Sequence, residues 1–139
     1  MKKVSLIGAG NIGGSLASII ANKNLADVML IDVIEGMAEG KALDISQAIA
    51  ITESSSKVEG STKLEEIKDS DVIIVTAGIA RKPGMSRDDL IETNLKIMKT
   101  VGSAIKEYSP NAVVICITNP LDAMVWSLKK ISGVKKEMI

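Results

Sequence analysis

Three closely spaced glycines, placed directly after an apolar run, constrain this chain more than any other feature. The run Lys3–Ile7 leads into Gly8-Ala9-Gly10-Asn11-Ile12-Gly13-Gly14, and the residues that follow have helical spacing to about Asn22. Glycine clusters of this spacing are common by chance, so the flanking strand and helix are what make this one informative. A strand, a tight turn and a helix in this order leave free N–H groups at the helix N-terminus, where an anion can bind.

The rest of the chain alternates between two kinds of segment. Short β-branched runs predict strands, and longer stretches with apolar residues three or four positions apart predict helices. The strands are predicted at Lys3–Ile7, Val28–Ile31, Val58–Ser61, Val72–Thr76 and Ala112–Thr118; beside a helical turn at Leu64–Ile67, helices are predicted from Glu35 to about Thr52, from Arg87 to Tyr108 and from Leu121 to Ser132. The strands lack strict alternation of apolar and polar residues, which predicts that both faces of the sheet are covered.

This alternation predicts an α/β domain with a doubly wound parallel sheet of the Rossmann type. The inferred strand order is 3-2-1-4-5, and Glu137–Ile139 is expected to begin a sixth strand. A length of 139 residues suits a single domain, so residues 1–139 are expected to form one unit. Because the sheet would then stop as a new strand begins, we expect the chain to be the first half of a longer protein.

The glycines and one acidic residue together predict a dinucleotide site. Gly8 allows the tight turn, Gly10 lets the backbone approach a pyrophosphate, and Gly13 lets the helix pack close to the strand. Asp32 closes the second strand, about twenty residues further on, where a carboxylate accepts hydrogen bonds from ribose hydroxyls. Its charge would repel a 2′-phosphate, which favours NAD over NADP. The alternative is that Asp32 only caps the following helix.

Composition excludes several other functions. The chain has no histidine, the commonest general acid/base and metal ligand, and we expect no metal site. Lysine plus arginine and aspartate plus glutamate number 17 each, and the only aromatic residues are Tyr108 and Trp126, so neither nucleic acid nor a membrane is expected as a partner. The single cysteine, Cys116, lies in an apolar run and is expected to be inert. A cytoplasmic location is the expectation.

Two arginines follow the fourth predicted strand. Arg81 and Arg87 flank a Pro83-Gly84 bend, in a segment that leaves the carboxyl end of a central strand. Open α/β sheets bind their ligands at that edge. A guanidinium binds a carboxylate through two parallel hydrogen bonds, so a pair of arginines suits a small dicarboxylate. The alternative is that both are solvated surface residues.

The segment Arg81–Leu90 is also the most specific part of a family resemblance. Together with Gly8–Gly14, Asp32 and Ile117–Pro120, it resembles the lactate/malate dehydrogenase family, and the malate dehydrogenases within it. The resemblance covers essentially the whole chain, as the N-terminal, NAD-binding half. It implies an oxidoreductase that interconverts malate and oxaloacetate, a tricarboxylic acid cycle reaction, by hydride transfer to NAD.

The resemblance also implies roles for individual residues. Arg81 would read the distal carboxylate of the substrate, and Arg87 would polarise the substrate oxygen as a catalytic residue. Asn119 would bind the substrate hydroxyl or the nicotinamide, although an Asn-Pro pair alone is more often a turn starter. The implied cofactor-binding residues are Gly8, Gly10, Asn11, Ile12, Gly13, Asp32, Thr76, Ala77, Gly78, Asn94, Thr118 and Asn119.

In the family, a histidine, its partner aspartate and a further arginine come from a C-terminal catalytic domain, which this chain lacks. We therefore expect the chain alone to have no useful turnover. The helix at Glu35–Thr52 corresponds to one at a subunit interface, and its small residues Gly36, Gly40 and Ala48 would permit close approach in a homo-oligomer. Two alternatives are a stand-alone NAD-binding sensor or interaction module and a lactate dehydrogenase fragment; the arginine pair disfavours the first, and Arg81 the second.

Overall fold

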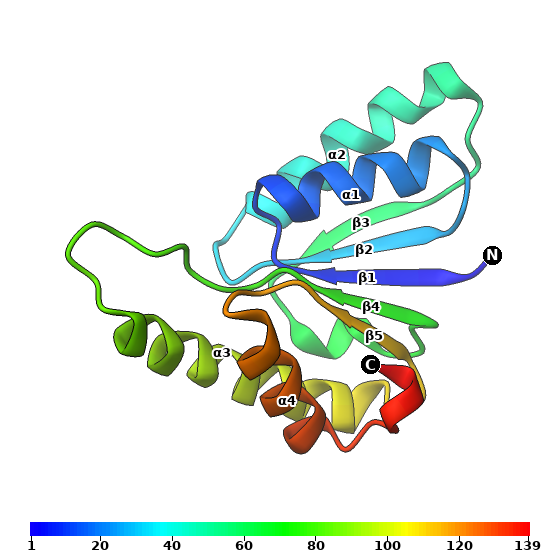
Figure 1. The fold of residues 1–139 in the computed structure, drawn as a ribbon. Coiled ribbons are helices and arrows are strands. Elements are labelled where there is room, and N and C mark those ends of the chain that lie inside the picture. Colours follow the sequence, from blue (N-terminus) through cyan, green and yellow to red (C-terminus); the bar gives the residue numbers. More distant parts are fainter.

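A five-stranded parallel sheet forms the centre of the molecule (Figure 1). The computed structural model describes residues 1–139. The strands are β1 (Lys3–Ile7), β2 (Asp27–Ile31), β3 (Val58–Ser61), β4 (Val72–Val75) and β5 (Val113–Cys116). Their order is β3-β2-β1-β4-β5, which confirms the predicted doubly wound topology.

Helices cover the two faces of the sheet in pairs. The helices α1 (Asn11–Asn22) and α2 (Met37–Ala48) lie on one face, and α3 (Arg87–Tyr108) and α4 (Leu121–Ser132) lie on the other (Figure 1). Three short 3-10 turns complete the chain: η1 (Ile49–Thr52), η2 (Leu64–Ile67) and η3 (Lys136–Met138). No helix is long and apolar enough to cross a membrane.

The pairing register explains why the strands are apolar on both faces. Leu6 of β1 lies beside Leu30 and Ile74 on the neighbouring strands, and all three belong to the core beneath α1 and α2. The next residue along each of these strands is Ile7, Ile31 or Val75, and these belong to the separate core beneath α3 and α4. The three central strands β1, β2 and β4 therefore contribute alternate side chains to two distinct cores.

The two cores differ in the size of their helical side chains. The α1/α2 layer contributes alanines that are almost wholly buried, among them Ala17, Ala21, Ala38 and Ala42. The α3/α4 layer contributes larger residues such as Met98, Ile105, Met124 and Leu128. Small side chains let α1 and α2 lie close to the strands.

The helix predicted from Glu35 to Thr52 is shorter than expected. Gly36 has a left-handed backbone (φ 79°) and α2 begins only at Met37. Its last turn tightens into the 3-10 turn η1, which retains the predicted buried residue Ile49. The predicted bounds of α3, α4, β1 and β3 agree with the structure.

Two expectations about the C-terminal part are wrong. Glu137–Ile139 does not begin a sixth strand: a Met138 N–H donates to the Lys135 carbonyl and closes a 3-10 turn, while Ile139 packs against the α3/α4 core. The outer strand β5 is not covered on both faces, since Val113 is 39% and Ile115 46% exposed. The helices α1 and α2 lie over β1, β2 and β3, so the face of β5 that is on their side of the sheet has no helix over it (Figure 1).

Two glycine-to-alanine substitutions test the contact between β3 and α2. A Cβ at Gly60 would overlap the Ala38 carbonyl group, so Gly60→Ala should lower the free energy of unfolding by about 1–3 kcal/mol. At Gly40, in α2, a Cβ meets nothing within 4 Å, so Gly40→Ala should raise it by up to about 1 kcal/mol. Urea denaturation measures both values, and effects of the same sign would contradict the packing.

Candidate functional site

The glycine turn joins β1 to α1 at the carboxyl edge of the sheet. Gly8 has a positive φ of 109°, and its N–H donates to the Ile31 carbonyl at 2.8 Å. Gly10 is the N-cap of α1, and no side chain caps this helix. The first N–H groups of a helix have no partner within it, so those that follow Gly10 are available to an anion.

Gly8, Gly13 and Thr76 pack closely against one another. A Cβ at Gly13 would overlap the Gly8 carbonyl, and a Cβ at Gly8 would clash with Thr76 and Ala77. The Thr76 hydroxyl donates to the Gly8 carbonyl at 2.9 Å. Gly10 differs, because a Cβ there meets nothing within 4 Å. The space beside Gly10 and the uncapped helix fit a pyrophosphate group.

Asp32 connects the end of β2 to the glycine turn. One carboxylate oxygen accepts from the Ala9 N–H at 2.7 Å and the other from the Ile34 N–H at 3.0 Å. Asp32 does not cap α2, whose N-cap is Gly36 with no side-chain hydrogen bond. Each carboxylate oxygen keeps further acceptor capacity, so ribose hydroxyls fit the same group.

Asn94 of α3 joins two loops at this edge. The side chain is fully buried, its amide oxygen accepts from the Ile79 N–H at 2.9 Å, and its amide nitrogen donates to the Asn119 carbonyl at 2.7 Å. Both ends of the amide therefore bind backbone groups and hold the two loops in place. The sequence alone did not reveal these contacts. The assigned role of Asn94 in cofactor contact stays a prediction.

The neighbouring loop residues also pack together. A Cβ at Gly78 would lie 2.5 Å from the Thr118 methyl carbon, and the Thr118 hydroxyl donates to the Ala77 carbonyl at 2.7 Å. The loops after β4 and β5 are thus held against one another. The predicted residues Ala77, Gly78, Asn94, Thr118 and Asn119 form one connected group.

Arg81 lies on the segment between β4 and α3, which projects away from the sheet edge, and Arg87 lies where this segment enters α3 (Figure 1). Arg81 donates through Nε to the Met85 carbonyl at 3.1 Å, which curls the loop around Pro83-Gly84. Arg87 is the first residue of α3. Both side chains are exposed and neither forms an ion pair, so the structure does not bring them onto a shared group.

A capping box begins α3 beside Arg87. The Ser86 hydroxyl accepts from the Asp89 N–H, and the Asp89 carboxylate accepts from the Ser86 N–H, both at 3.0 Å. The hydrogen bonds with Ser86 hold the pKa of Asp89 below its usual range. An ionised carboxylate in the first turn interacts favourably with the positive end of the helix dipole. The capping box sets the start of α3 and so the position of Arg87, its first residue.

Sequence reasoning also missed Lys41, which contacts the glycine turn from α2. Its ammonium group donates to the Gly10 carbonyl at 3.1 Å, across 31 positions of sequence. Nothing in the local pattern around Lys41 signals this contact.

A separate prediction concerns Cys116 of β5, which is buried in the α3/α4 core as expected. Burial raises the pKa of its thiol.

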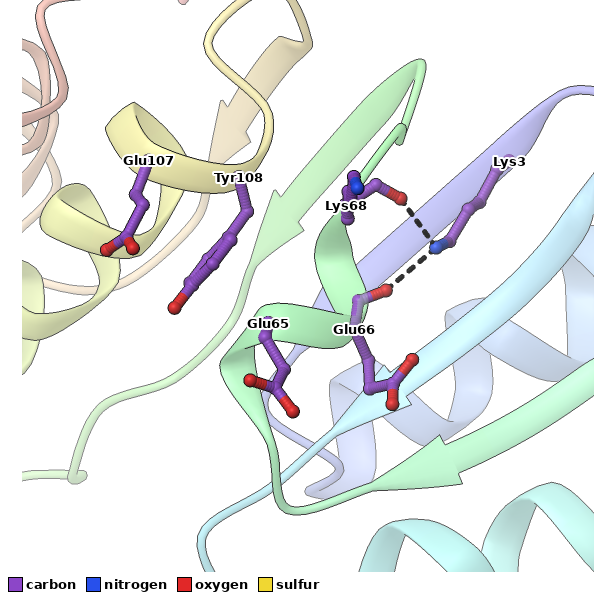
Figure 2. Close-up of a pocket in the computed structure, with 6 residues that line it drawn as sticks. All are labelled: Lys3, Glu65, Glu66, Lys68, Glu107 and Tyr108. Carbon is purple, nitrogen blue, oxygen red and sulfur yellow. Dashed lines mark hydrogen bonds between the residues drawn. The ribbon is translucent and has the colours of Figure 1, made fainter.

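A separate hollow lies where β1 begins, so it is at the opposite end of that strand from the glycine turn (Figure 2). It is lined by Lys3, Glu65, Glu66, Lys68, Glu107 and Tyr108. The Lys3 ammonium donates to the carbonyls of Glu66 and Lys68 at 2.7 Å each (Figure 2). The charge of Glu107 raises the pKa of Tyr108. This hollow holds no part of the predicted site, and no cluster of metal-ligating side chains occurs in the structure.

The fold and the glycine turn define a dinucleotide-binding domain, and comparison with known proteins specifies its family. The family described as "lactate/malate dehydrogenase, NAD binding domain" matches residues 2–139. The chain belongs to this family and is its NAD-binding domain, with NAD as the cofactor.

Individual relatives agree with this assignment. The malate dehydrogenase of Methylobacterium radiotolerans is 56% identical over 99% of this chain and 43% of its own length. The apo malate dehydrogenase of Picrophilus torridus is 45% identical with a TM-score of 0.95, over 99% of this chain and 44% of that one. The lactate dehydrogenase of Eimeria maxima, solved with NADH and oxamate, is 45% identical with a TM-score of 0.94, over 99% and 42% of the two chains. The chain thus spans less than half the length of these relatives.

Substitutions at two glycines should separate cofactor binding from folding. Gly10→Ala adds a methyl group where no protein atom lies, so it should keep the thermal stability and weaken NAD binding about ten-fold or more by blocking the pyrophosphate. Gly13→Ala forces α1 away from Gly8 and should lower stability as well. Calorimetric titration and thermal unfolding measure the two effects, and unchanged NAD affinity in Gly10→Ala would refute the site.

Proposed function

We propose that the chain is the NAD-binding half of an NAD-dependent malate dehydrogenase, which interconverts malate and oxaloacetate. The observation that carries the proposal is the exposed arginine segment beside the cofactor site. Arg81 and Arg87 have no carboxylate partner in the protein, so the charge of each guanidinium is available to a substrate, although Nε of Arg81 also donates to the Met85 carbonyl. A dicarboxylate with an oxygen at C2 offers each of them a partner.

The proposed roles are those that the family resemblance implies, and the charge and position of the residues are consistent with them. Arg81 binds the distal carboxylate and so distinguishes a dicarboxylate from a monocarboxylate. Arg87, fixed by the capping box, polarises the substrate oxygen and stabilises the charge that develops there. Asn119, held through its backbone by Asn94, directs its side chain toward the substrate hydroxyl or the nicotinamide. NAD, when bound, accepts or donates the hydride.

The chain alone is proposed to lack useful turnover. It contains no histidine, the residue whose ordinary pKa best suits proton transfer near neutral pH. Loss of a proton-transfer group costs about 10²–10⁴-fold in rate. In this proposal the remaining catalytic groups would come from a C-terminal catalytic domain.

The proposal includes a preference for NAD over NADP. The Asp32 carboxylate lies against the glycine turn, where it would face the adenosine ribose. A second negative charge on the 2′ oxygen would be repelled there. No arginine or lysine adjoins Asp32 in the sequence to offset this repulsion.

The arginine pair Arg81 and Arg87 distinguishes the proposal from the two alternatives. A stand-alone NAD-binding sensor or interaction module needs no arginine pair on the segment after β4. A lactate dehydrogenase fragment has the same fold, as the Eimeria maxima relative illustrates, but a monocarboxylate would leave Arg81 without a partner. Arg81 therefore favours malate.

A chimera tests the reaction. The chain, joined to the part of the Methylobacterium radiotolerans malate dehydrogenase that follows the matched region, should oxidise malate with NAD and act poorly on lactate. Arg81→Gln in this chimera should lower kcat/KM for malate by about 10–100-fold, because one charge-assisted contact is lost. NADH formation measured by absorbance reports both.

The control is Lys82→Gln, which removes the neighbouring exposed cation and should leave malate oxidation unchanged. The 139-residue chain alone should produce no NADH. A chimera that binds NADH but prefers lactate would establish the lactate dehydrogenase alternative. One that binds NADH and oxidises neither acid would refute the proposed reaction.

A homo-oligomer in the cytoplasm completes the proposal. Gly36, Gly40 and Ala48 are all exposed, and the outward side of α2 also presents Leu43, which is 60% exposed. A surface with small residues around an apolar one suits close helix contact with a second copy. Sedimentation velocity should show association at high protein concentration, and a monomer throughout would contradict it.

A further inference from the structure

Lys41 connects α2 to the start of α1. Its ammonium group lies 3.1 Å from the carbonyl oxygen of Gly10, which is the N-cap residue of α1. It lines a hollow between the two helices together with Asp44, yet it forms no ion pair with that or any other carboxylate. A positive charge without a protein counter-charge is therefore held beside the glycine turn.

Gly14 makes room for this lysine. The motif spacing uses Gly8, Gly10 and Gly13, and it leaves the fourth glycine without a role. A Cβ at Gly14 would lie 3.2 Å from Cδ and 3.3 Å from Nζ of Lys41, tighter than ordinary contact. The lysine stem thus passes over a position of α1 that has no side chain, and a Cβ there would shift it by a few tenths of an ångström.

The contact acts on the group that a phosphate would meet. The Gly10 carbonyl and the Asn11 N–H belong to one peptide unit, and the carbonyl also accepts the Gly14 N–H at 2.9 Å. A cation on the carbonyl polarises the peptide, so the Asn11 N–H becomes a stronger donor. The charge also adds to the positive end of the helix dipole. Its 3.1 Å distance from the Gly10 carbonyl is shorter than the Debye length, so salt screens this interaction only in part.

We propose that Lys41 is a positioning residue for the cofactor: it holds the glycine turn through the Gly10 carbonyl and strengthens the N–H groups that receive the pyrophosphate, while Gly14 keeps its path open. The inference rests on NAD binding at this turn. It is independent of the substrate and of dehydrogenase turnover.

A pair of ligands tests the role directly. ADP-ribose carries the pyrophosphate and adenosine lacks it, so Lys41→Met should weaken ADP-ribose binding about three- to ten-fold and leave adenosine binding unchanged. Calorimetry measures the first ligand, and NMR titration measures the weaker second. The ADP-ribose affinity of the unmodified chain should also fall more steeply with salt than that of Lys41→Met.

Two further lysine variants control for charge and geometry. Lys41→Arg keeps the charge and donors and should restore most of the affinity. Lys99→Met removes an equal charge from an exposed position of α3, in the other layer, and should change neither ligand. A loss of ADP-ribose binding in Lys99→Met equal to that in Lys41→Met would overturn the inference, because net charge alone would then explain the effect.

Gly14→Ala provides a second route to the same contact. It should favour the helix and shift the lysine by a few tenths of an ångström, so it should weaken ADP-ribose binding less than Lys41→Met does. In a Lys41→Met background the same substitution should cause no further loss, since the contact is already absent. If Lys41→Met fails to fold, Lys41→Gln, which also removes the charge, replaces it in every comparison.

Besides an equal loss in Lys99→Met, three results would overturn the inference while NAD binding stands: unchanged ADP-ribose affinity in Lys41→Met, equal losses for ADP-ribose and adenosine, or additive losses in the double variant. If the unmodified chain binds neither NAD nor ADP-ribose, the cofactor site itself is refuted instead.

Discussion

The close approach of Gly13 to the Gly8 carbonyl is the contact on which the rest of the molecule depends. It brings the first turn of α1 against the end of β1, so the uncapped N-terminus of the helix lies at the carboxyl edge of the sheet. The buried alanines Ala17 and Ala21 continue the same close packing along α1. Asp32 and Thr76 then bind the turn from the two neighbouring strands. These contacts hold in place a turn that consists mostly of backbone.

Asn94 performs the corresponding task at the other half of the edge. Its amide joins the segment that leads to the arginines to the carbonyl of Asn119. A buried amide bound at both ends is costly to leave unsatisfied, so the two loops keep their spacing. The arginine segment is by contrast exposed beyond Ile79, and Arg81 is held only through Met85. The proposed site would thus combine a fixed base with a projecting segment whose two arginines supply the positive charge.

Most of the fold could be predicted from the sequence because its signals are local. The bounds of β1, α3 and α4 follow from apolar spacing and from the capping residues beside them, and the strand order follows from the right-handed crossovers of such sheets. The failures occurred where the outcome depends on distant packing. Ile139 finds the α3/α4 core, and this favours a turn over a strand. The contact of Lys41 with Gly10 and the bonds of Asn94 join residues far apart in sequence, for which no spacing rule exists.

The separation of the two cores has an evolutionary consequence. Substitutions around the arginine segment and α3 repack one layer, while the glycine turn, α1 and α2 belong to the other, and the sheet keeps the two apart. Substitutions on the arginine segment can therefore accumulate without disturbing the packing of the glycine turn. A malate dehydrogenase and a lactate dehydrogenase are each 45% identical to this chain, with TM-scores of 0.95 and 0.94, so the same backbone persists in relatives that are named for different substrates.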